Sequence, residues 1–188
     1  NKMIEIINLT KSYYIKGEKV PIFRDISFTM KKGESVAILG KNGAGKSTLL
    51  RIIGGIDFPD SGKVNSNCSI SWPVGLVGGF QGSLTGRENV TFVSKIFSDD
   101  SKYKINERIK KVEEFAEINE FFDKPFKLYS SGMKSRITFG LSMAFDFDVY
   151  LIDEVSSAGD ERFREKSRKY LNEKLENSDF IMVDHNLS

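Results

Sequence analysis

The sequence contains a glycine-rich stretch that ends in a lysine and two hydroxyl residues. It fits the pattern GxxxxGK[ST] in full and reads Gly40-Lys41-Asn42-Gly43-Ala44-Gly45-Lys46-Ser47-Thr48. Glycines let backbone N–H groups turn toward phosphate oxygens through conformations that a Cβ would block, and a following helix adds the positive end of its dipole. Lys46 would bring a charge to the β- and γ-phosphates, and Ser47 would offer Mg²⁺ a hard oxygen ligand. The stretch therefore predicts a site for a nucleoside triphosphate and magnesium.

Two carboxylates follow a second apolar run, over residues 149–152. Asp153 fits a Mg²⁺ ligand acting through water, and Glu154 fits a group that orients the attacking water. Taken alone, the pair reads better as solvated acids at a strand end, but a phosphate loop in the same chain favours the functional interpretation. His185, the only histidine, follows the apolar run 180–183, where its ring could reach a γ-phosphate. A structural histidine is the alternative interpretation.

The elements that must position these residues follow from the hydrophobic pattern. Short continuous apolar runs at 35–39, 149–152 and 180–183 are typical of buried parallel strands, and helical patterns alternate with them. The sequence therefore predicts an α/β fold with its functional residues at the carboxyl ends of the strands. Residues 3–9 and 26–30 alternate apolar with polar side chains, which indicates an antiparallel β lobe.

Several helices are expected beside this sheet. The spacing Thr85-Gly-Arg-Glu88 matches a capping box and predicts a helix start, and an apolar face at 3.6-residue spacing predicts a helix over 105–116. The charge-rich residues 160–176 indicate a solvated amphipathic helix. Ser130 is a candidate N-cap, and a second helix start with a free hydroxyl suggests an anion site for the ATP of a second subunit.

The composition excludes several classes of protein. Hydrophobic residues make up 39% of the 188 residues and charged residues 29%, which is typical of one globular domain rather than of a disordered chain. The net charge of +2 does not indicate a nucleic-acid binder. Cys68 is the only cysteine, which suits a reducing compartment. The longest wholly apolar runs are four residues and no export leader is visible, so we expect neither a membrane span nor export.

Taken together, these residues resemble the ATP-binding domain of ABC transporters, over nearly the whole chain. In that family the phosphate loop matches Gly40 to Thr48, the Mg²⁺ aspartate matches Asp153, the catalytic glutamate matches Glu154 and the switch histidine matches His185. The resemblance implies further ATP contacts from an adenine-stacking aromatic (Tyr13), the Q-loop (Gln81), the signature motif (Ser130, Ser131, Gly132, Met133) and the D-loop (Asp160). It also places Gln81 at the Mg²⁺. The cofactors it implies are ATP and Mg²⁺.

The resemblance carries expectations about fold and partners. It implies a single ABC-type domain over 1–188, with a P-loop NTPase core of mostly parallel sheet and flanking helices, an N-terminal antiparallel β lobe and a helical subdomain. The expected bounds are 34–80 and 145–188 for the core, 84–144 for the helical subdomain, and 1–33 with 61–72 for the β lobe. Two copies would pack head to tail around two ATPs. The sequence stops three residues after His185, whereas the family usually continues, so we expect it to be truncated.

The signature motif departs from the usual LSGGQ. Tyr129, Ser131 and Met133 replace Leu, the first Gly and Gln, whereas Ser130 and Gly132 remain. This variant and the stretch 71–89 are most similar to the ATPase subunits of capsular polysaccharide exporters. The resemblance then implies a peripheral subunit on the cytoplasmic side of the inner membrane. Its partner would be a separate polytopic permease that contacts residues 81–97 and alone meets the polysaccharide; no nucleic acid is expected.

Other readings stay open. An O-antigen or teichoic-acid exporter shares all of these motifs. A non-transport ABC ATPase acting on DNA or ribosomes is less favoured, because only about 50 residues separate Gln81 from Ser130 and they carry no sustained heptads. A small-molecule kinase would explain the phosphate loop, but neither the motif at 130–133 nor His185.

Overall fold

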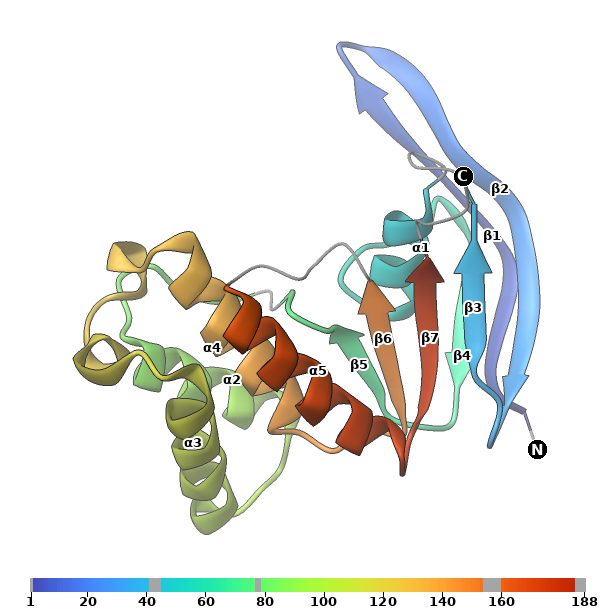
Figure 1. Cartoon of the computed structure of the whole chain (residues 1–188). Helices are drawn as coiled ribbons and strands as arrows, with labels where there is room; N and C mark the ends of the chain where they lie inside the picture. The colour runs from blue at the N-terminus through green and yellow to red at the C-terminus, as the bar shows by residue number, and fades with distance from the viewer. Residues whose placement is uncertain (1, 41–44, 77–78, 154–159, 185–188) are drawn as a thin grey trace. The chain divides into compact units, whose positions relative to one another are not determined.

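A computed structural model describes residues 2–40, 45–76, 79–153 and 160–184 of the chain (Figure 1). The chain divides into two compact units. The first is formed by residues 1–73, 147–155 and 175–188, and the second by residues 74–146 and 156–174. Within the described ranges, no helix is both long and apolar enough to cross a membrane.

An antiparallel sheet opens the first unit. Its strand order is β2-β1-β4, and its strands are β1 (Lys2–Ile15), β2 (Glu18–Lys31) and β4 (Ser61–Ser66). The β1–β2 hairpin extends beyond β4 at its turn end (Figure 1). Both strands run well past the alternating segments that predicted them. The β1–β2 register shifts near Asn8 and Asp25, which have left-handed backbone angles of φ 47° and 50°, and such bulges interrupt the alternation of side chains.

A parallel sheet carries the predicted α/β pattern in the same unit. Its strand order is β3-β7-β6-β5, and its strands are β3 (Val36–Leu39), β5 (Ile70–Pro73), β6 (Val149–Asp153) and β7 (Asp179–Asp184). Three of these strands are the continuous apolar runs of the sequence. The fourth, β5, pairs with β6, whereas β4 in the same expected segment 61–72 pairs with β1. Helix α1 (Lys46–Ile53) follows β3.

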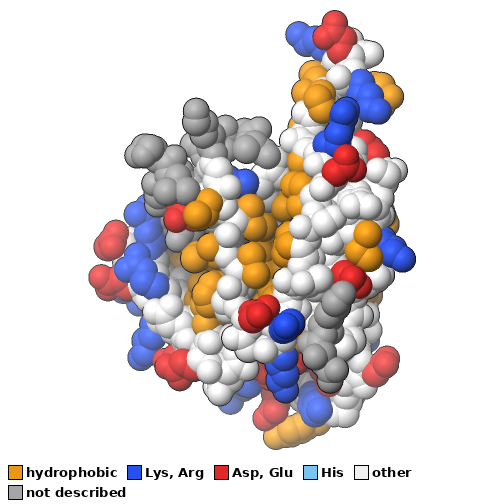
Figure 2. Space-filling model, turned by 90° about the vertical axis from the view of Figure 1, so that its right-hand side faces the viewer, with side chains coloured by type: hydrophobic (Ala, Val, Ile, Leu, Met, Phe, Trp, Pro, Cys, Tyr) orange, Lys and Arg blue, Asp and Glu red, His pale blue; other side chains and the backbone are white. Residues whose placement is uncertain are grey.

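One hydrophobic core joins the two sheets and α1. Buried side chains come from β1, β2, α1, β6 and β7, and include Ile4, Ile6, Leu9, Met30, Leu49, Leu50, Ile53, Val149, Leu151, Ile181 and Val183. Half-buried apolar residues of β2 and β3, among them Phe23, Phe28 and Ile38, pack against this core. Figure 2 shows apolar side chains gathered along the open face beside the protruding hairpin. The core fixes α1, and so the residues at its start, against both sheets.

The second unit is helical. It contains α2 (Gly86–Phe97), α3 (Lys102–Ala116), two short 3₁₀ helices, η1 (Asn119–Asp123) and η2 (Phe126–Leu128), then α4 (Ser131–Met143) and most of α5 (Glu161–Leu175). The capping box at Thr85 and Glu88 is present, with both reciprocal hydrogen bonds. The predicted face of α3 is buried, including Ile109 and Val112. The helix signals in the sequence are therefore confirmed.

Candidate nucleotide-binding site

The end of the glycine-rich loop begins α1, as the sequence predicts. Gly40 directly follows β3, and Gly45 is the N-cap of α1 with a left-handed backbone, φ 81°. A Cβ on Gly45 would collide with the Ile22 side chain and lie 3.2 Å from the Phe23 ring, so glycine is required here. Four members of the loop, Lys41, Asn42, Gly43 and Ala44, lie outside the described residues.

Lys46, the first residue of α1, is bonded to the residue at which the glycine-rich stretch begins. Its side chain is buried, and its ammonium donates a hydrogen bond to the carbonyl oxygen of Gly40 at the other end of the loop. A buried ammonium beside a helix N-terminus is a strong local attraction for an anion. The neighbouring Thr48 is also buried, and its hydroxyl accepts a hydrogen bond of 3.2 Å from Arg51.

Ser47 and Asp153 meet although 106 positions separate them. The Ser47 hydroxyl donates to Asp153 Oδ2 at 2.7 Å. Asp153 ends β6 beside Val183 of β7, and Leu39 of β3 pairs with Asp184 of β7, so the carboxyl ends of the three strands share one edge. The hydroxyl and the carboxylate thus present two hard oxygens at one point, and this donor set suits Mg²⁺. Glu154 and His185, expected at the same edge, lie outside the described residues.

Tyr13 belongs to the same unit and is half-buried near the turn of the hairpin. Its hydroxyl donates to Asp57 Oδ2 at 2.5 Å, and the Lys11 ammonium lies 4.9 Å from the centroid of its ring. The pKa of the Asp57 carboxyl lies below its ordinary value, first because of the hydrogen bond from Tyr13 and then because of Phe58 N–H and Lys11. No local pattern in the sequence indicated this cluster.

The second unit holds the other expected nucleotide contacts. Ser130 is the N-cap of α4, and its Oγ accepts from the backbone N–H of Met133 at 3.1 Å, as predicted. Ser131 is exposed, and a Cβ on Gly132 would meet Ser130 Oγ at an ordinary contact distance of 4.0 Å. A hollow of about 390 Å³ lies beside this helix start and is lined in part by Ser130, Gly132, Met133, Arg136 and Asp160.

Asp160 is engaged within the second unit. Its Oδ1 accepts from the backbone N–H of Phe163 at 2.9 Å, at the start of α5, and its Oδ2 accepts from Arg136 at 2.9 Å. These bonds hold the pKa of the Asp160 carboxyl below its ordinary value, the Phe163 N–H being the first cause. One carboxylate oxygen thus bonds the start of α5 and the other bonds α4, a link between the two helices that the sequence did not indicate.

Gln81 is positioned by a residue that sequence reasoning missed. Asn89 is fully buried, and its side chain accepts from the Gln81 backbone N–H at 2.7 Å and donates to the Gln81 carbonyl at 3.0 Å. It also donates to the carbonyls of Leu84 and Thr85, while the Gln81 side chain is exposed. The one available signal was a polar amide among the apolar positions of α2.

The comparisons with known proteins decide the family. The model of the ABC transporter family matches residues 23–157, which span the phosphate loop, the signature motif and Asp153. The chain belongs to the ABC transporter family. It is an ABC ATPase, and ATP is its nucleotide.

Individual relatives of this ABC ATPase are named as ATP-binding proteins of polysaccharide transport or O-antigen export. It is 56% identical to the polysialic acid transport ATP-binding protein KpsT of Escherichia coli, over 99% of this chain and 82% of that one. The capsule polysaccharide export ATP-binding protein CtrD of Neisseria meningitidis serogroup B is 45% identical, over 99% and 84%. The O-antigen export system ATP-binding protein RfbB of Klebsiella pneumoniae is 38% identical, over 93% and 71%. The resemblance to capsular polysaccharide export ATPases is thus confirmed.

A solved structure supports the fold. The chain resembles MJ0796, described as a bacterial ABC transporter cassette in a dimeric structure, with a TM-score of 0.74 and 25% identity over 98% of this chain and 89% of that one. The predicted α/β fold class, with a parallel sheet, an antiparallel sheet and helices, is confirmed.

Proposed function

We propose that this ABC ATPase drives the export of capsular polysaccharide across the inner membrane, through a separate permease subunit. The observation that carries the proposal is the Ser47–Asp153 pair at the end of the phosphate loop, in a chain 56% identical to a polysialic acid transport ATP-binding protein. We further propose that residues 1–188 form one ABC-type ATP-binding domain. O-antigen export is the second candidate, supported by 38% identity to RfbB, and the higher identity to KpsT favours the capsular class.

The described residues suit phosphoryl transfer from ATP to water. Lys46 would move its hydrogen bond from the Gly40 carbonyl to the β- and γ-phosphate oxygens, since a charged acceptor binds an ammonium more strongly than a carbonyl does. Ser47 and Asp153 would hold Mg²⁺, with Gln81 as a further ligand. When bound, this cation neutralises charge on the phosphate oxygens. Glu154 would orient the attacking water, and His185 would contact the γ-phosphate.

The signature motif would act on the ATP of a second copy. Ser130 caps α4, so the first backbone N–H groups of this helix and the Ser130 hydroxyl form a place where a γ-phosphate could bind. The phosphate loop of this chain already serves its own ATP. A head-to-tail dimer with two shared ATPs therefore supports hydrolysis best, and the dimeric structure of the MJ0796 cassette is in keeping with it.

The outer face of α2 would contact the permease. Phe92, Ile96 and Phe97 are 44%, 59% and 55% exposed, and the first two are four positions apart on one face of the helix. This helix begins five positions after Gln81, so the region 81–97 joins a nucleotide-sensing segment to an apolar surface. Apolar side chains exposed side by side favour a protein partner. Binding to the permease would hold the subunit at the cytoplasmic face of the membrane.

The experiment that tests the chemistry is a nucleotide titration with variants of the intact protein. We expect Lys46→Ala to lose ATP affinity, and Glu154→Gln to keep ATP affinity while losing hydrolysis. Lys63→Ala, an exposed lysine of β4, is the matched control and should behave as wild type. Unchanged ATP affinity in Lys46→Ala would refute the phosphate-loop assignment, and undiminished hydrolysis in Glu154→Gln would remove Glu154 from its role.

The experiment that tests the permease surface compares two exposed apolar residues. Phe92→Ser should reduce copurification of the chain with a polytopic membrane protein and leave the ATP affinity unchanged. Tyr103→Ser, on the exposed side of α3, is the control and should change neither. Equal copurification in Phe92→Ser and wild type would place the contact elsewhere.

A further inference from the structure

Two side chains, those of Lys11 and Asp57, contact the tyrosine whose ring is expected to stack on adenine. Lys11 donates to Asp57 Oδ1 at 3.2 Å and to the carbonyl of Phe58 at 2.6 Å, while Tyr13 donates to Asp57 Oδ2 at 2.5 Å. The Lys11 side chain is 11% exposed and that of Asp57 25%. The Asp57 carboxylate thus accepts one hydrogen bond from Lys11 on Oδ1 and one from Tyr13 on Oδ2.

The loop that carries Asp57 is bound at both of its ends. The backbone N–H groups of Ile56 and Asp57 donate to the carbonyl of Arg51, in the last turn of α1, at 2.9 and 3.3 Å. Farther along, the Asp60 N–H donates to the Thr10 carbonyl at 2.8 Å, and Asp60 Oδ2 accepts from the backbone N–H of residue 12 at 2.7 Å. The loop is therefore fixed to α1 on one side and to β1 on the other.

This arrangement connects the phosphate end of the site to Tyr13 through one short helix. Lys46 and Ser47 begin α1, and Asp57 is bonded to its last turn. An eight-residue helix has a length of about 12 Å and little freedom to bend. Tyr13 is thereby connected, through Asp57 and the last turn of α1, to the helix whose first residues are Lys46 and Ser47.

We propose that Asp57 and Lys11 are positioning residues for the nucleobase, which hold the Tyr13 ring where it stacks on adenine and so set the base-dependent part of nucleotide affinity. This inference rests on the proposed ATP-binding role of Tyr13 and names the side chains through which it acts. The Lys11 ammonium lies over one face of the ring, so the base takes the other face. A ring held in advance loses less side-chain entropy when the base stacks on it.

The charge of Asp57 contributes to this role. The pKa of its carboxyl is lowered, so the group is ionised at neutral pH and accepts the Tyr13 hydroxyl as a charged acceptor. Asparagine keeps the size and one acceptor oxygen but removes the charge that holds Lys11. Asp57→Asn is therefore the sharpest single change, and Tyr13→Phe removes the other end of the same hydrogen bond while keeping the ring.

The test compares two ligands that share a triphosphate but differ in the base. Calorimetric titrations of the whole chain use ATP and inorganic tripolyphosphate, each with Mg²⁺. We expect Asp57→Asn and Tyr13→Phe each to weaken ATP binding about 3- to 10-fold and to leave tripolyphosphate binding unchanged. The double variant should lose less ATP affinity than the sum of the two single losses, because both changes weaken the hydrogen bond between Tyr13 and Asp57.

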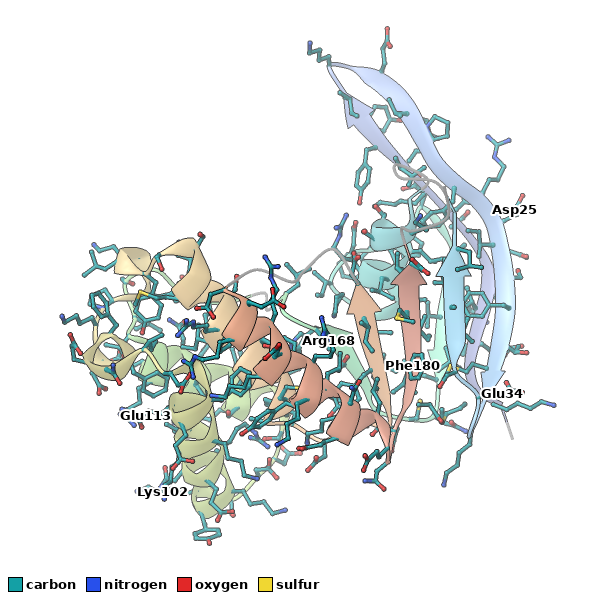
Figure 3. The ribbon with its side chains drawn as sticks, viewed as in Figure 1. Asp25, Glu34, Lys102, Glu113, Arg168 and Phe180 are labelled. Atoms are coloured by element: carbon teal, nitrogen blue, oxygen red, sulfur yellow. The ribbon has the colours of Figure 1, made fainter. Side chains whose placement is uncertain are left out.

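A matched control is available on the same hairpin. Asp25 is exposed and lies along the outer side of β2 (Figure 3), so Asp25→Asn makes the same chemical change away from the cluster. It should bind both ligands as wild type does. A loss of ATP and tripolyphosphate affinity in equal proportion in Asp57→Asn would indicate a purely structural role and overturn the proposal, and so would an Asp57→Asn effect that persists in full on the Tyr13→Phe background.

Failure of the underlying function gives a different result. If wild type binds neither ligand, or if Lys46→Ala binds ATP as wild type does, the nucleotide assignment itself is wrong and the positioning role falls with it. If wild type binds ATP more tightly than tripolyphosphate and Tyr13→Leu retains that difference, the nucleotide function stands. In that case Tyr13 is not the stacking residue, and the positioning proposal is refuted.

Discussion

Gly86 packs against the tyrosine that opens the unusual signature motif, and adding a methyl group there should destabilise the chain. A Cβ on Gly86 would collide with the Tyr129 hydroxyl and lie 2.8 Å from Ile137 Cδ1 and 3.2 Å from the Phe122 ring. The Tyr129 side chain is buried, and its hydroxyl donates to the Phe121 carbonyl at 2.5 Å. Tyrosine in place of the usual leucine is therefore accommodated by a glycine 43 positions earlier.

The size of the effect follows from three terms. Overpacking of a buried site costs about 1–3 kcal/mol, and displacement of the Tyr129 hydroxyl from its acceptor costs about 1 kcal/mol. Alanine at a helix position regains up to about 1 kcal/mol over glycine. Gly86→Ala should thus lower the free energy of unfolding by about 2 kcal/mol, which corresponds to a melting temperature about 4–8 °C lower in a chain of this length.

Thermal unfolding of four proteins provides the assay. They are wild type, Gly86→Ala, Tyr129→Phe and the double variant, with Gly82→Ala as a glycine control whose Cβ would meet only Lys127 at an ordinary 3.4 Å. Because Tyr129→Phe removes the atom closest to the added methyl group, the double variant should be more stable than the sum of the single losses by about 1 kcal/mol. Additive losses, or a Gly86→Ala protein as stable as Gly82→Ala, would refute this reasoning.

Three further predictions concern other charged and polar groups. Arg108 forms an ion pair with Asp100 at 2.6 Å, and its guanidinium lies 3.8 Å from the centroid of the Phe145 ring. Arg108→Ala should therefore lower the free energy of unfolding, measured in denaturant titrations, by about 3 kcal/mol. Arg108→Lys, which keeps the positive charge, should lower it by less. Burial raises the pKa of the Cys68 thiol, so a higher pH is needed to form the thiolate that reacts with an alkylating reagent. The alkylation rate of Cys68 should therefore still rise with pH where the rate of an exposed thiol has become constant. A Cys68 rate that becomes constant at the same pH or a lower one would contradict this. The pKa of Asp57 is lowered, so the stability it contributes is present above the ordinary carboxyl pKa and is lost as the pH falls through the lowered value. The melting-temperature gap between wild type and Asp57→Asn should therefore close as the pH falls below the ordinary carboxyl range, and a constant gap would contradict this.

Local patterns in the sequence predicted the elements that depend on neighbouring residues. The capping box at Thr85, the N-cap at Ser130 and the buried face of α3 all involve side chains within about one helical turn of one another. β6 was visible because burial on both faces leaves the continuous apolar run 149–152. β3 was found from the same kind of run, although its residues alternate between half-buried and exposed. The full length of β1 was not visible, because the bulge at Asn8 shifts the side-chain alternation.

The contacts that shape the candidate site depend on long-range pairing. The Ser47–Asp153 bond could be expected only because a phosphate loop and an acidic strand end suggest one Mg²⁺ site. The cluster at Tyr13 has no such chemical signature, since Asp57 lies 44 positions away and reaches the ring only when α1 packs on the sheets. Asn89 lies eight positions after Gln81, within α2, and holds the Gln81 backbone by hydrogen bonds. The only signal of this contact in the sequence was a polar amide among the apolar positions of the helix.

The central claim is that ATP hydrolysis at this site drives polysaccharide export through a separate permease. It is tested most directly by expressing Glu154→Gln in its native bacterium, solubilising the membranes gently with ATP present, and identifying by mass spectrometry what copurifies with the chain. The account predicts a polytopic membrane protein together with capsular polysaccharide. Recovery of only ribosomal or DNA-bound material would contradict the transport role and leave the ATPase chemistry standing.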